Sequence, residues 1–266
     1  MTSAAQKNTD TLSLDRLHPD NTALFFDFDG VIAGIVDDPS DVTVPSDVLR
    51  NLTDLRRLAG KATAIVSGRE IDRLDQFLAP LRLPAAGVHG AERRTEQGEM
   101  LTTGYDETAF AALKDRVERF ASEHEGLVTE AKAGSVALHY RGRPDLEEAC
   151  MTLADALQEE MDDVHAVPGK MVVEIKLADR TKADAIRDFM DEPPFFGRTP
   201  VFFGDDVTDE DGFRAVNDLG GLSVKVGDGE TAAQERLKDT AAFQAWLGEI
   251  VRRWSEEIDR MAGRKA

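Results

Sequence analysis

Leu24–Val31 reads Leu-Phe-Phe-Asp-Phe-Asp-Gly-Val, an apolar run that ends in two aspartates and a glycine. Ala23–Phe26 predicts a buried strand, and residues two apart on an extended chain point to the same side. Asp27 and Asp29 are therefore expected together at the carboxyl end of this strand, where ligands bind in open α/β sheets. We interpret the pair as a site for a hard metal ion, with one carboxylate free to act as a nucleophile. The alternative is two solvated aspartates in a turn before Gly30.

Three further groups of polar residues follow predicted strands or begin predicted helices. They are Ser67-Gly68 after the strand expected at Ala62–Val66, Lys182 at a helix start, and Asp205-Asp206 after the strand expected at Pro200–Phe203. A serine hydroxyl and free backbone amides suit a phosphate oxygen. Taken singly, the three groups have plainer explanations, which are a helix N-cap, a solvated lysine and helix-start carboxylates. Their shared position at strand ends and helix starts favours one common site.

The pattern of apolar residues predicts the fold class. Continuous apolar strands alternate with amphipathic helices before residue 95 and again after residue 182, which predicts an α/β fold with a doubly wound, mostly parallel sheet. Between them, a helix–hairpin–helix–hairpin pattern predicts an inserted α+β domain. We expect a core of residues 20–98 and 178–250, a cap of residues 99–177, and flexible ends at residues 1–19 and 251–266. Two short helices are expected after the last strand, Leu222–Val226.

The composition limits the class of partner. The 266 residues carry 32 basic and 51 acidic side chains, a formal net charge of −19, so neither nucleic acid nor an anionic membrane surface is an expected partner. A phosphate substrate would need local positive charge from a metal ion, a lysine, an arginine or backbone amides. The single cysteine, Cys150, fits a reducing compartment, and no secretory signal or membrane-spanning run is apparent. A cytoplasmic location is expected.

Four short motifs resemble those of a known superfamily. They are Asp-Phe-Asp-Gly-Val (27–31), Val-Ser-Gly-Arg (66–69), Lys182 and Gly-Asp-Asp-Val-Thr-Asp-Glu (204–210). Together they resemble the motifs of the haloacid dehalogenase-type phosphatases, and the insertion is similar to the open-faced α/β cap of that superfamily. Four longer segments, 86–94, 137–141, 169–176 and 197–206, resemble the bacterial trehalose-6-phosphate phosphatases. The similarity runs from about Ala23 to Trp246.

The resemblance implies a reaction as well as a fold. It implies a Mg²⁺-dependent phosphatase that hydrolyses trehalose 6-phosphate, the last step of trehalose biosynthesis, with a role in osmoprotection. Asp27 would be the nucleophile that forms an aspartyl phosphate, and Asp29 would protonate the leaving sugar oxygen and then activate water. Ser67 and Lys182 would hold the phosphoryl group during transfer.

The metal ligands are likewise implied by the resemblance. They would be a carboxylate oxygen of Asp27, the backbone carbonyl of Asp29, and Asp205, while Asp206 and Asp209 would orient these ligands or Lys182. Oxygen ligands without a His/Cys cluster favour Mg²⁺ over Zn²⁺. One departure from the family pattern is Ala183, which stands where the family usually has glycine; we expect the function of the lysine before it to survive.

The resemblance also implies a set of residues that contact the substrate. They are Gly68, Arg69, His89, Glu92 and Arg94 from the core, and His139, Lys170 and Glu174 from the cap. Lys170 and Glu174 are four apart, so a strand would place both on one face, although a surface charge pair explains them more simply. The expected partner is a small phosphorylated disaccharide, and the protein is expected to be a monomer or a weak homo-oligomer.

Two rival functions remain open at this point. The first is another phosphatase of the superfamily, acting on sucrose phosphate or on glucosyl- or mannosyl-phosphoglycerate, since only cap contacts would differ. The second is a catalytically silent phosphosugar-binding domain. Such a domain should have lost a motif carboxylate, whereas Asp27, Asp29, Ser67, Lys182 and Asp205 are all present.

Overall fold

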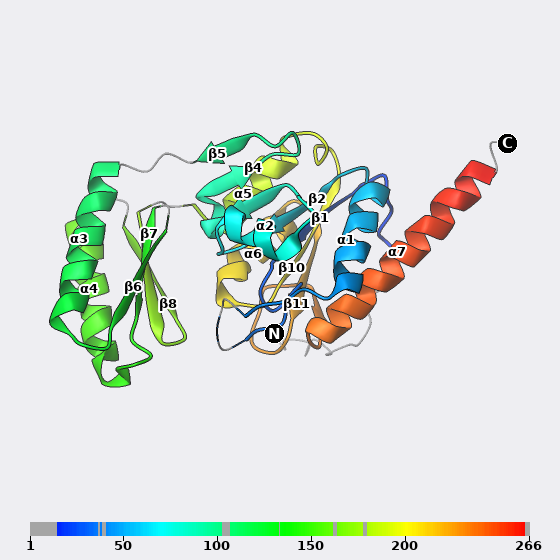
Figure 1. Cartoon of the computed structure of the whole chain (residues 1–266). Helices are drawn as coiled ribbons and strands as arrows, with labels where there is room; N and C mark the ends of the chain where they lie inside the picture. Colours follow the sequence, from blue (N-terminus) through cyan, green and yellow to red (C-terminus); the bar gives the residue numbers. More distant parts are fainter. Residues whose placement is uncertain are drawn as a thin grey trace, which may run out of the picture. The chain divides into compact units, whose positions relative to one another are not determined.

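A computed structural model describes residues 15–36, 38, 41–102, 107–132, 134–161, 164–177 and 180–263. The chain divides into two compact units, one formed by Met1–Leu101 with Thr181–Ala266 and the other by Thr102–Arg180. The described residues form two sheets, one of eight strands and one of four, which Figure 1 shows. Among the described residues, no helix has the length and apolar character needed to span a bilayer.

The larger sheet has the strand order β12-β11-β10-β1-β2-β3-β4-β5. Its strands are β1 (Thr22–Phe26), β2 (Thr63–Val66), β3 (Ala85–Gly87), β4 (Glu92–Arg94), β5 (Met100–Thr102), β10 (Thr199–Gly204), β11 (Leu222–Val226) and β12 (Glu235–Leu237). Every pairing from β12 to β3 is parallel, and β3 pairs with β4 in antiparallel fashion. The predicted α/β fold with a mostly parallel sheet is confirmed.

Helices cover both faces of this sheet. They are α1 (Ser46–Leu58), α2 (Ile71–Leu78), α5 (Lys182–Met190), α6 (Glu210–Asp218) and α7 (Thr240–Gly263), with short 3₁₀ turns at Val88–Gly90 and Val207–Asp209. Leu24 and Phe26 of β1 pack into an apolar cluster with α1, α2 and α7, whereas Ala23 and Phe25 pack into a second cluster with α5 and α6. Both faces of β1 are buried, which is why its sequence is apolar throughout.

The predictions for the end of the chain are wrong. Instead of two short helices and a fraying tail, β12 follows β11 and one long helix, α7, continues to Gly263 (Figure 1). The indole of Trp254 is buried, and its N–H donates to the carbonyl of Leu17 at 3.1 Å. This contact with the N-terminal segment anchors the helix beyond the predicted boundary. Of the two ends predicted to be flexible, residues 1–14 and 264–266 lie outside the described residues.

The smaller sheet has the order β6-β7-β9-β8, with every pairing antiparallel. Its strands are β6 (Val128–Lys132), β7 (Ser135–His139), β8 (His165–Gly169) and β9 (Val172–Lys176), and its helices are α3 (Glu107–Glu123) and α4 (Glu147–Glu160), the latter preceded by a 3₁₀ turn at Pro144–Leu146. Both helices pack on one face of the sheet (Figure 1). Cys150 is buried in the core of this unit. The sheet consists of the two predicted hairpins, β6–β7 and β8–β9, which are joined by the pairing of β7 with β9.

Candidate active site

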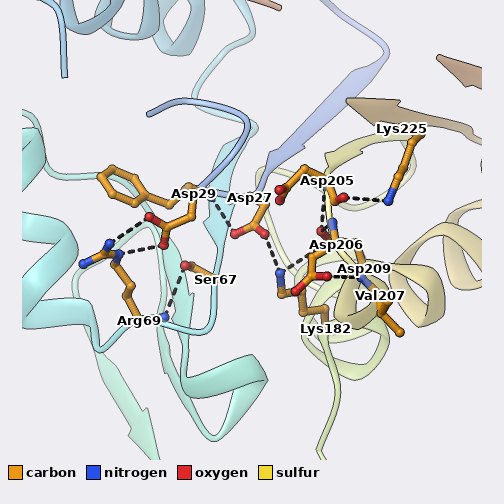
Figure 2. Close-up of polar contacts among 11 residues, drawn as sticks. Asp27, Asp29, Ser67, Arg69, Lys182, Asp205, Asp206, Val207, Asp209 and Lys225 are labelled. Carbon is orange, nitrogen blue, oxygen red and sulfur yellow. Dashed lines mark hydrogen bonds and ion pairs between the residues drawn. The ribbon is translucent and has the colours of Figure 1, made fainter. Parts of the chain in front are cut away.

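Asp27 and Asp29 follow β1, as predicted, but they face different partners (Figure 2). Asp27 is 5% exposed. Its Oδ1 accepts the backbone N–H of Phe28 at 2.6 Å, and its Oδ2 accepts the ammonium of Lys182 at 2.7 Å. The Asp29 carboxylate instead accepts two hydrogen bonds from the guanidinium of Arg69, at 2.7 and 2.8 Å. The two carboxylates are therefore close in the chain but bind different cations, Lys182 and Arg69.

Arg69 is fixed in place by more than this ion pair. Its guanidinium carbon lies 5.5 Å from the ring centre of Phe28 and 5.0 Å from that of Phe77. A cation over an aromatic face is attracted by the ring quadrupole. Arg69, predicted to contact the substrate, is in this structure the partner that orients Asp29.

Lys182 is the centre of a buried ion cluster. It begins α5, whose N-cap residue Thr181 forms a reciprocal capping box with Asp184, so a well-defined helix start positions the lysine. Lys182 is 2% exposed, and its Nζ donates to Asp27 Oδ2 at 2.7 Å and to Asp209 Oδ1 at 2.6 Å. The alternative interpretation of Lys182 as a solvated lysine is therefore wrong.

Burial and neighbouring charges oppose each other in this cluster. Burial lowers the pKa of Lys182, but the negative charges of Asp209 and Asp27 outweigh burial, so the net pKa is raised. Burial also raises the pKa of Asp27 well above its usual value, although the Lys182 charge opposes that shift. A protonated lysine thus stabilises the ionised form of a carboxylate that burial alone would neutralise.

Asp205, Asp206 and Asp209 organise the loop that follows β10. Oδ2 of Asp209 accepts the backbone N–H groups of Asp205 at 2.8 Å and of Asp206 at 3.0 Å. Asp209 thereby joins this loop to Lys182, one of the roles predicted for it. Asp206 is exposed, and its Oδ1 caps the next turn by accepting the N–H of Val207 at 2.6 Å.

The acidic residues at the ends of β1 and β10 fit a metal ion. Asp27, Asp205 and Asp209 offer carboxylate oxygens that lie within 4.8 Å of one another. Gly30 has φ +71°, and a Cβ there would lie 2.0 Å from Oδ2 of Asp205, so glycine is needed for this approach. Burial raises the pKa of Asp205 to about 7, and the charge of Asp209 adds to the rise. Oxygen ligands whose charges repel one another in this way suit a hard divalent cation.

Ser67 and Gly68 follow β2, but α2 begins only at Ile71. Ser67 is therefore not the helix N-cap, which was the alternative interpretation. Its Oγ accepts the backbone N–H of Arg69 at 3.2 Å. His89 lies against this loop, because a Cβ on Gly68 would be 2.7 Å from the His89 Nε2.

Val88 and His89 hold the left-handed backbone conformation, with φ of +48° and +55°. This conformation costs about 1–3 kcal/mol for a residue other than glycine. The backbone N–H of Val88 donates to the Arg69 carbonyl at 3.1 Å, and that of His89 donates to the Ser67 carbonyl at 3.0 Å. These bonds hold the strained turn against the predicted phosphate loop.

Glu92 and Arg94 make structural contacts. Oε1 of Glu92 accepts the N–H of Ile71 at 2.6 Å and so satisfies the start of α2. Arg94 is 6% exposed, and its guanidinium donates twice to the Asp75 carboxylate, both at 2.7 Å, and twice to the Leu83 carbonyl. The donors of Arg94 are used within the fold in this structure, and its predicted contact with the substrate stays a prediction.

Arg94→Met should lower stability without changing the KM for substrate. We expect the free energy of unfolding to fall by about 2–3 kcal/mol, because hydrogen bonds to a charged partner are lost in a buried setting. Denaturant unfolding and steady-state kinetics measure the two effects. Arg82→Met is the matched control, since Arg82 pairs with the same Asp75 but is 72% exposed. A raised KM at an unchanged free energy of unfolding would indicate instead that Arg94 contacts the substrate.

The remaining predicted substrate residues lie in the second unit. Oε1 of Glu174 accepts the Ser135 hydroxyl at 3.0 Å, and Nε2 of His139 lies 3.4 Å from the Glu130 carboxylate. Ala137 pairs in register with both Glu130 and Glu174, so these two carboxylates flank it on one face of the sheet. Glu130 was not predicted, because only the antiparallel register brings it beside Glu174.

Lys170 departs from its predicted position. It lies in the turn between β8 and β9, because β9 begins at Val172. The prediction that a single strand places Lys170 and Glu174 on one face is therefore wrong. Met171, the second residue of the turn, has φ +62°, and this reversal ends the strand pattern that the spacing of four had suggested.

The chain is similar to known proteins in sequence and in fold. Residues 25–243 match the family model described as trehalose-phosphatase. The trehalose-6-phosphate phosphatase of Escherichia coli (strain K12) is 43% identical over 225 residues, which cover 85% of each chain. The solved C-terminal domain of the trehalose-6-phosphate phosphatase of Candida albicans superposes with a TM-score of 0.75 at 22% identity, covering 87% of this chain and 92% of that chain.

A second solved structure extends the comparison of the fold. It is a phosphatase of the haloalkanoate (HAD) enzyme superfamily from Bacteroides thetaiotaomicron, which superposes with a TM-score of 0.61 at 14% identity and covers 90% of this chain and 97% of that chain. At these identities, the structural likenesses establish the fold alone.

Proposed function

The chain belongs to the trehalose-phosphatase family of enzymes, and we propose that it hydrolyses trehalose 6-phosphate to trehalose and phosphate through an aspartyl phosphate on Asp27. The observation that carries the proposal is the position of Lys182, whose buried ammonium bonds Asp27 on one side and Asp209 on the other. This contact directs the carboxylate of Asp27, and the lysine charge opposes the rise in pKa that burial causes, so it favours the ionised form that a nucleophile needs.

The proposed reaction has two displacements at phosphorus. In the first, a bond forms between Asp27 and phosphorus while the bond from phosphorus to the sugar oxygen breaks, and Asp29 gives its proton to that oxygen. In the second, Asp29 takes a proton from the attacking water, and Asp27 is released as phosphate forms. Two easier steps replace one difficult step. Asp29 suits the proton transfers because it is more exposed than Asp27.

The neighbouring groups would stabilise charge at the phosphoryl group. Ser67 would contact a phosphate oxygen through its hydroxyl, and Lys182 would place its positive charge beside the reacting carboxylate. We propose Mg²⁺ as the cation held by Asp27 and Asp205, with the Asp29 carbonyl, and with Asp209 in the same cluster. When bound, it would screen the charges of the nucleophile and the phosphate from each other.

We propose that the second unit selects the sugar. Glu174, Glu130 and His139 come from three adjacent strands of its sheet, and carboxylates and imidazoles are suitable partners for sugar hydroxyls. Lys170 adds a flexible cation from the adjoining turn. The assignment of Lys170, His139 and Glu174 to substrate binding rests on the sequence resemblance, and the shared sheet face of the two carboxylates and the imidazole supports it.

The test is phosphate release with Mg²⁺ from trehalose 6-phosphate, sucrose 6-phosphate, glucose 6-phosphate and glucosyl-3-phosphoglycerate. We expect a strong preference for trehalose 6-phosphate. Glu174→Ala should lower kcat/KM for that substrate by about 10–100-fold, the equivalent of one hydrogen bond to a charged group. Glu159→Ala, which removes an exposed carboxylate of the same unit, is the control.

The other outcomes are informative as well. Preference for a different sugar phosphate would keep the chemistry at Asp27 and reject the proposed substrate. No turnover of any compound by a folded, Mg²⁺-binding protein would favour the silent binding domain. In that case Ala183 would be examined first, since it is the departure from the family pattern beside Lys182.

A further inference from the structure

A second buried lysine lies beside the carboxylate cluster, and the proposed reaction does not use it. Lys225 lies on β11, where its register partner is Gly204, the last residue of β10. It is 5% exposed, and its Nζ donates to the backbone carbonyl of Asp205 at 2.6 Å (Figure 2). A lysine within the apolar sequence of a central strand is unusual, because strands of a parallel sheet are buried on both faces.

Lys225 completes a clamp on one peptide unit. The peptide that joins Asp205 to Asp206 has its carbonyl held by Lys225 and its N–H held by Oδ2 of Asp209 at 3.0 Å. The preceding N–H, that of Asp205, donates to the same Asp209 oxygen at 2.8 Å. Hydrogen bonds to both the carbonyl and the N–H fix the orientation of this peptide. Its orientation in turn affects the direction in which the Asp205 side chain leaves the backbone.

The burial of the Lys225 charge is unfavourable for the stability of the fold. The carbonyl of Asp205 is the only hydrogen-bond partner of the Lys225 ammonium among the described residues, so a charge is buried without a directly bonded counter-ion. Burying a charge in this way costs several kcal/mol, and an apolar side chain of similar volume is often more stabilising. The charge of Lys225 must therefore serve something other than packing.

We propose that Lys225 is a positioning residue for the metal ligand Asp205, and that it increases Mg²⁺ affinity although it is itself a cation. By holding the 205–206 peptide, it keeps the Asp205 carboxylate directed at Asp27 and Asp209. The inference rests on the Mg²⁺ site of the proposed function. Removal of groups that orient metal ligands typically weakens metal binding by about 10–100-fold.

The sign of the effect separates positioning from simple electrostatics. A positive charge close to a metal site repels the metal, so if Lys225 acted only through its charge, removing it would tighten Mg²⁺ binding. If Lys225 acts by fixing the peptide, removing it frees the Asp205 carboxylate and weakens binding. At a pH where the Asp205 carboxyl is ionised in both proteins, so that the Lys225 charge does not act through the proton on Asp205, the two accounts predict opposite directions for the same substitution.

The experiment is calorimetric titration of the full chain with Mg²⁺ in the absence of substrate. We expect Lys225→Met to raise the dissociation constant by about 10–100-fold and Lys225→Arg, which keeps a charged donor, to recover most of the affinity. Lys238→Met, which removes an exposed lysine, should bind like the unmodified protein. The metal-free melting temperature of Lys225→Met should be unchanged or higher, because a buried charge is removed.

Several results would overturn the inference. Lys225→Met that binds Mg²⁺ as tightly as the unmodified protein, or more tightly, contradicts it. If Lys225→Met does not fold, Lys225→Gln takes its place, because the shorter, neutral side chain does not reach the Asp205 carbonyl at the same distance, and the same comparison applies. Failure of the unmodified protein to bind Mg²⁺ is a distinct result that rejects the proposed metal site together with the inference.

Discussion

Asp27→Asn should reduce phosphate release to background. Asparagine has nearly the same shape as aspartate, but its amide oxygen is not a competent nucleophile toward phosphorus. Since enzymes accelerate phosphate monoester hydrolysis by up to ~10²¹-fold, a variant that cannot form the covalent intermediate should retain essentially no turnover. The fold should persist, because a neutral group replaces a buried carboxylate whose pKa burial already raises.

Steady-state phosphate release and acid-quench mass spectrometry test this expectation. In the unmodified protein mixed with substrate, a phosphoryl adduct should appear on the peptide that contains Asp27, and in Asp27→Asn it should be absent. Asp211→Asn is the matched control, since Asp211 is an exposed aspartate on α6 that pairs with Arg214. Near-normal rates in Asp27→Asn would exclude covalent catalysis at this residue.

The sequence predicts the central sheet and the order of the site motifs well, because both depend on local patterns. The apolar run before Asp27 and the one before Asp205 mark strands buried on both faces, and polar residues directly after such runs must lie at the carboxyl edge of the sheet. The structure confirms that the acidic residues after β1 and β10 lie close together at the same edge of the sheet.

Burial of charged residues could not be predicted in the same way. A lysine at a helix start has the same local pattern whether it is solvated or buried, and only the partners of Lys182, which are 155 and 27 residues away in the chain, distinguish the two. Lys225 belongs to none of the four motifs, although its position inside an apolar strand is a usable signal. The resemblance predicts a substrate contact for Arg94, whereas its contact with Asp75 depends on tertiary packing, which no local pattern predicts.

The errors at the end of the chain have a related cause. The charge-rich sequence of residues 251–266 predicts a flexible end, yet Trp254 is buried and contacts Leu17, 237 residues earlier. Likewise, Glu130 lies beside Glu174 only through the antiparallel register of β6, β7 and β9. Periodicity shows which residues share a face of one element, but it does not show which elements are neighbours.

Chelation of divalent metal should likewise reduce phosphate release to background, and added Mg²⁺ should restore it. The carboxylates of Asp27, Asp205 and Asp209 would otherwise face a phosphate dianion, and the positive charges of Lys182 and Lys225 would not balance so many negative charges. Dialysis against a chelator followed by titration with Mg²⁺ measures the loss and the recovery. Persistent turnover in the chelator would contradict a metal-dependent mechanism.

The affinity for Mg²⁺ should also depend on pH in a defined direction. In the metal-free protein, burial raises the pKa of Asp205 to about 7, so below pH 7 a bound proton must leave before the carboxylate can bind a cation. The apparent dissociation constant should therefore rise by up to about tenfold for each unit of pH below 7 and level off above it.

The same pKa predicts how stability should change. A carboxyl whose pKa is raised on folding stabilises the native state at low pH, and this contribution is lost as pH rises through about 7. The metal-free melting temperature should therefore fall between pH 5 and pH 8, and saturating Mg²⁺ should reduce that fall. Asp205→Asn should lose most of the Mg²⁺ affinity and this part of the pH dependence together. An affinity for Mg²⁺ that is constant between pH 5 and pH 8 would show that Asp205 is not a ligand whose proton the metal displaces.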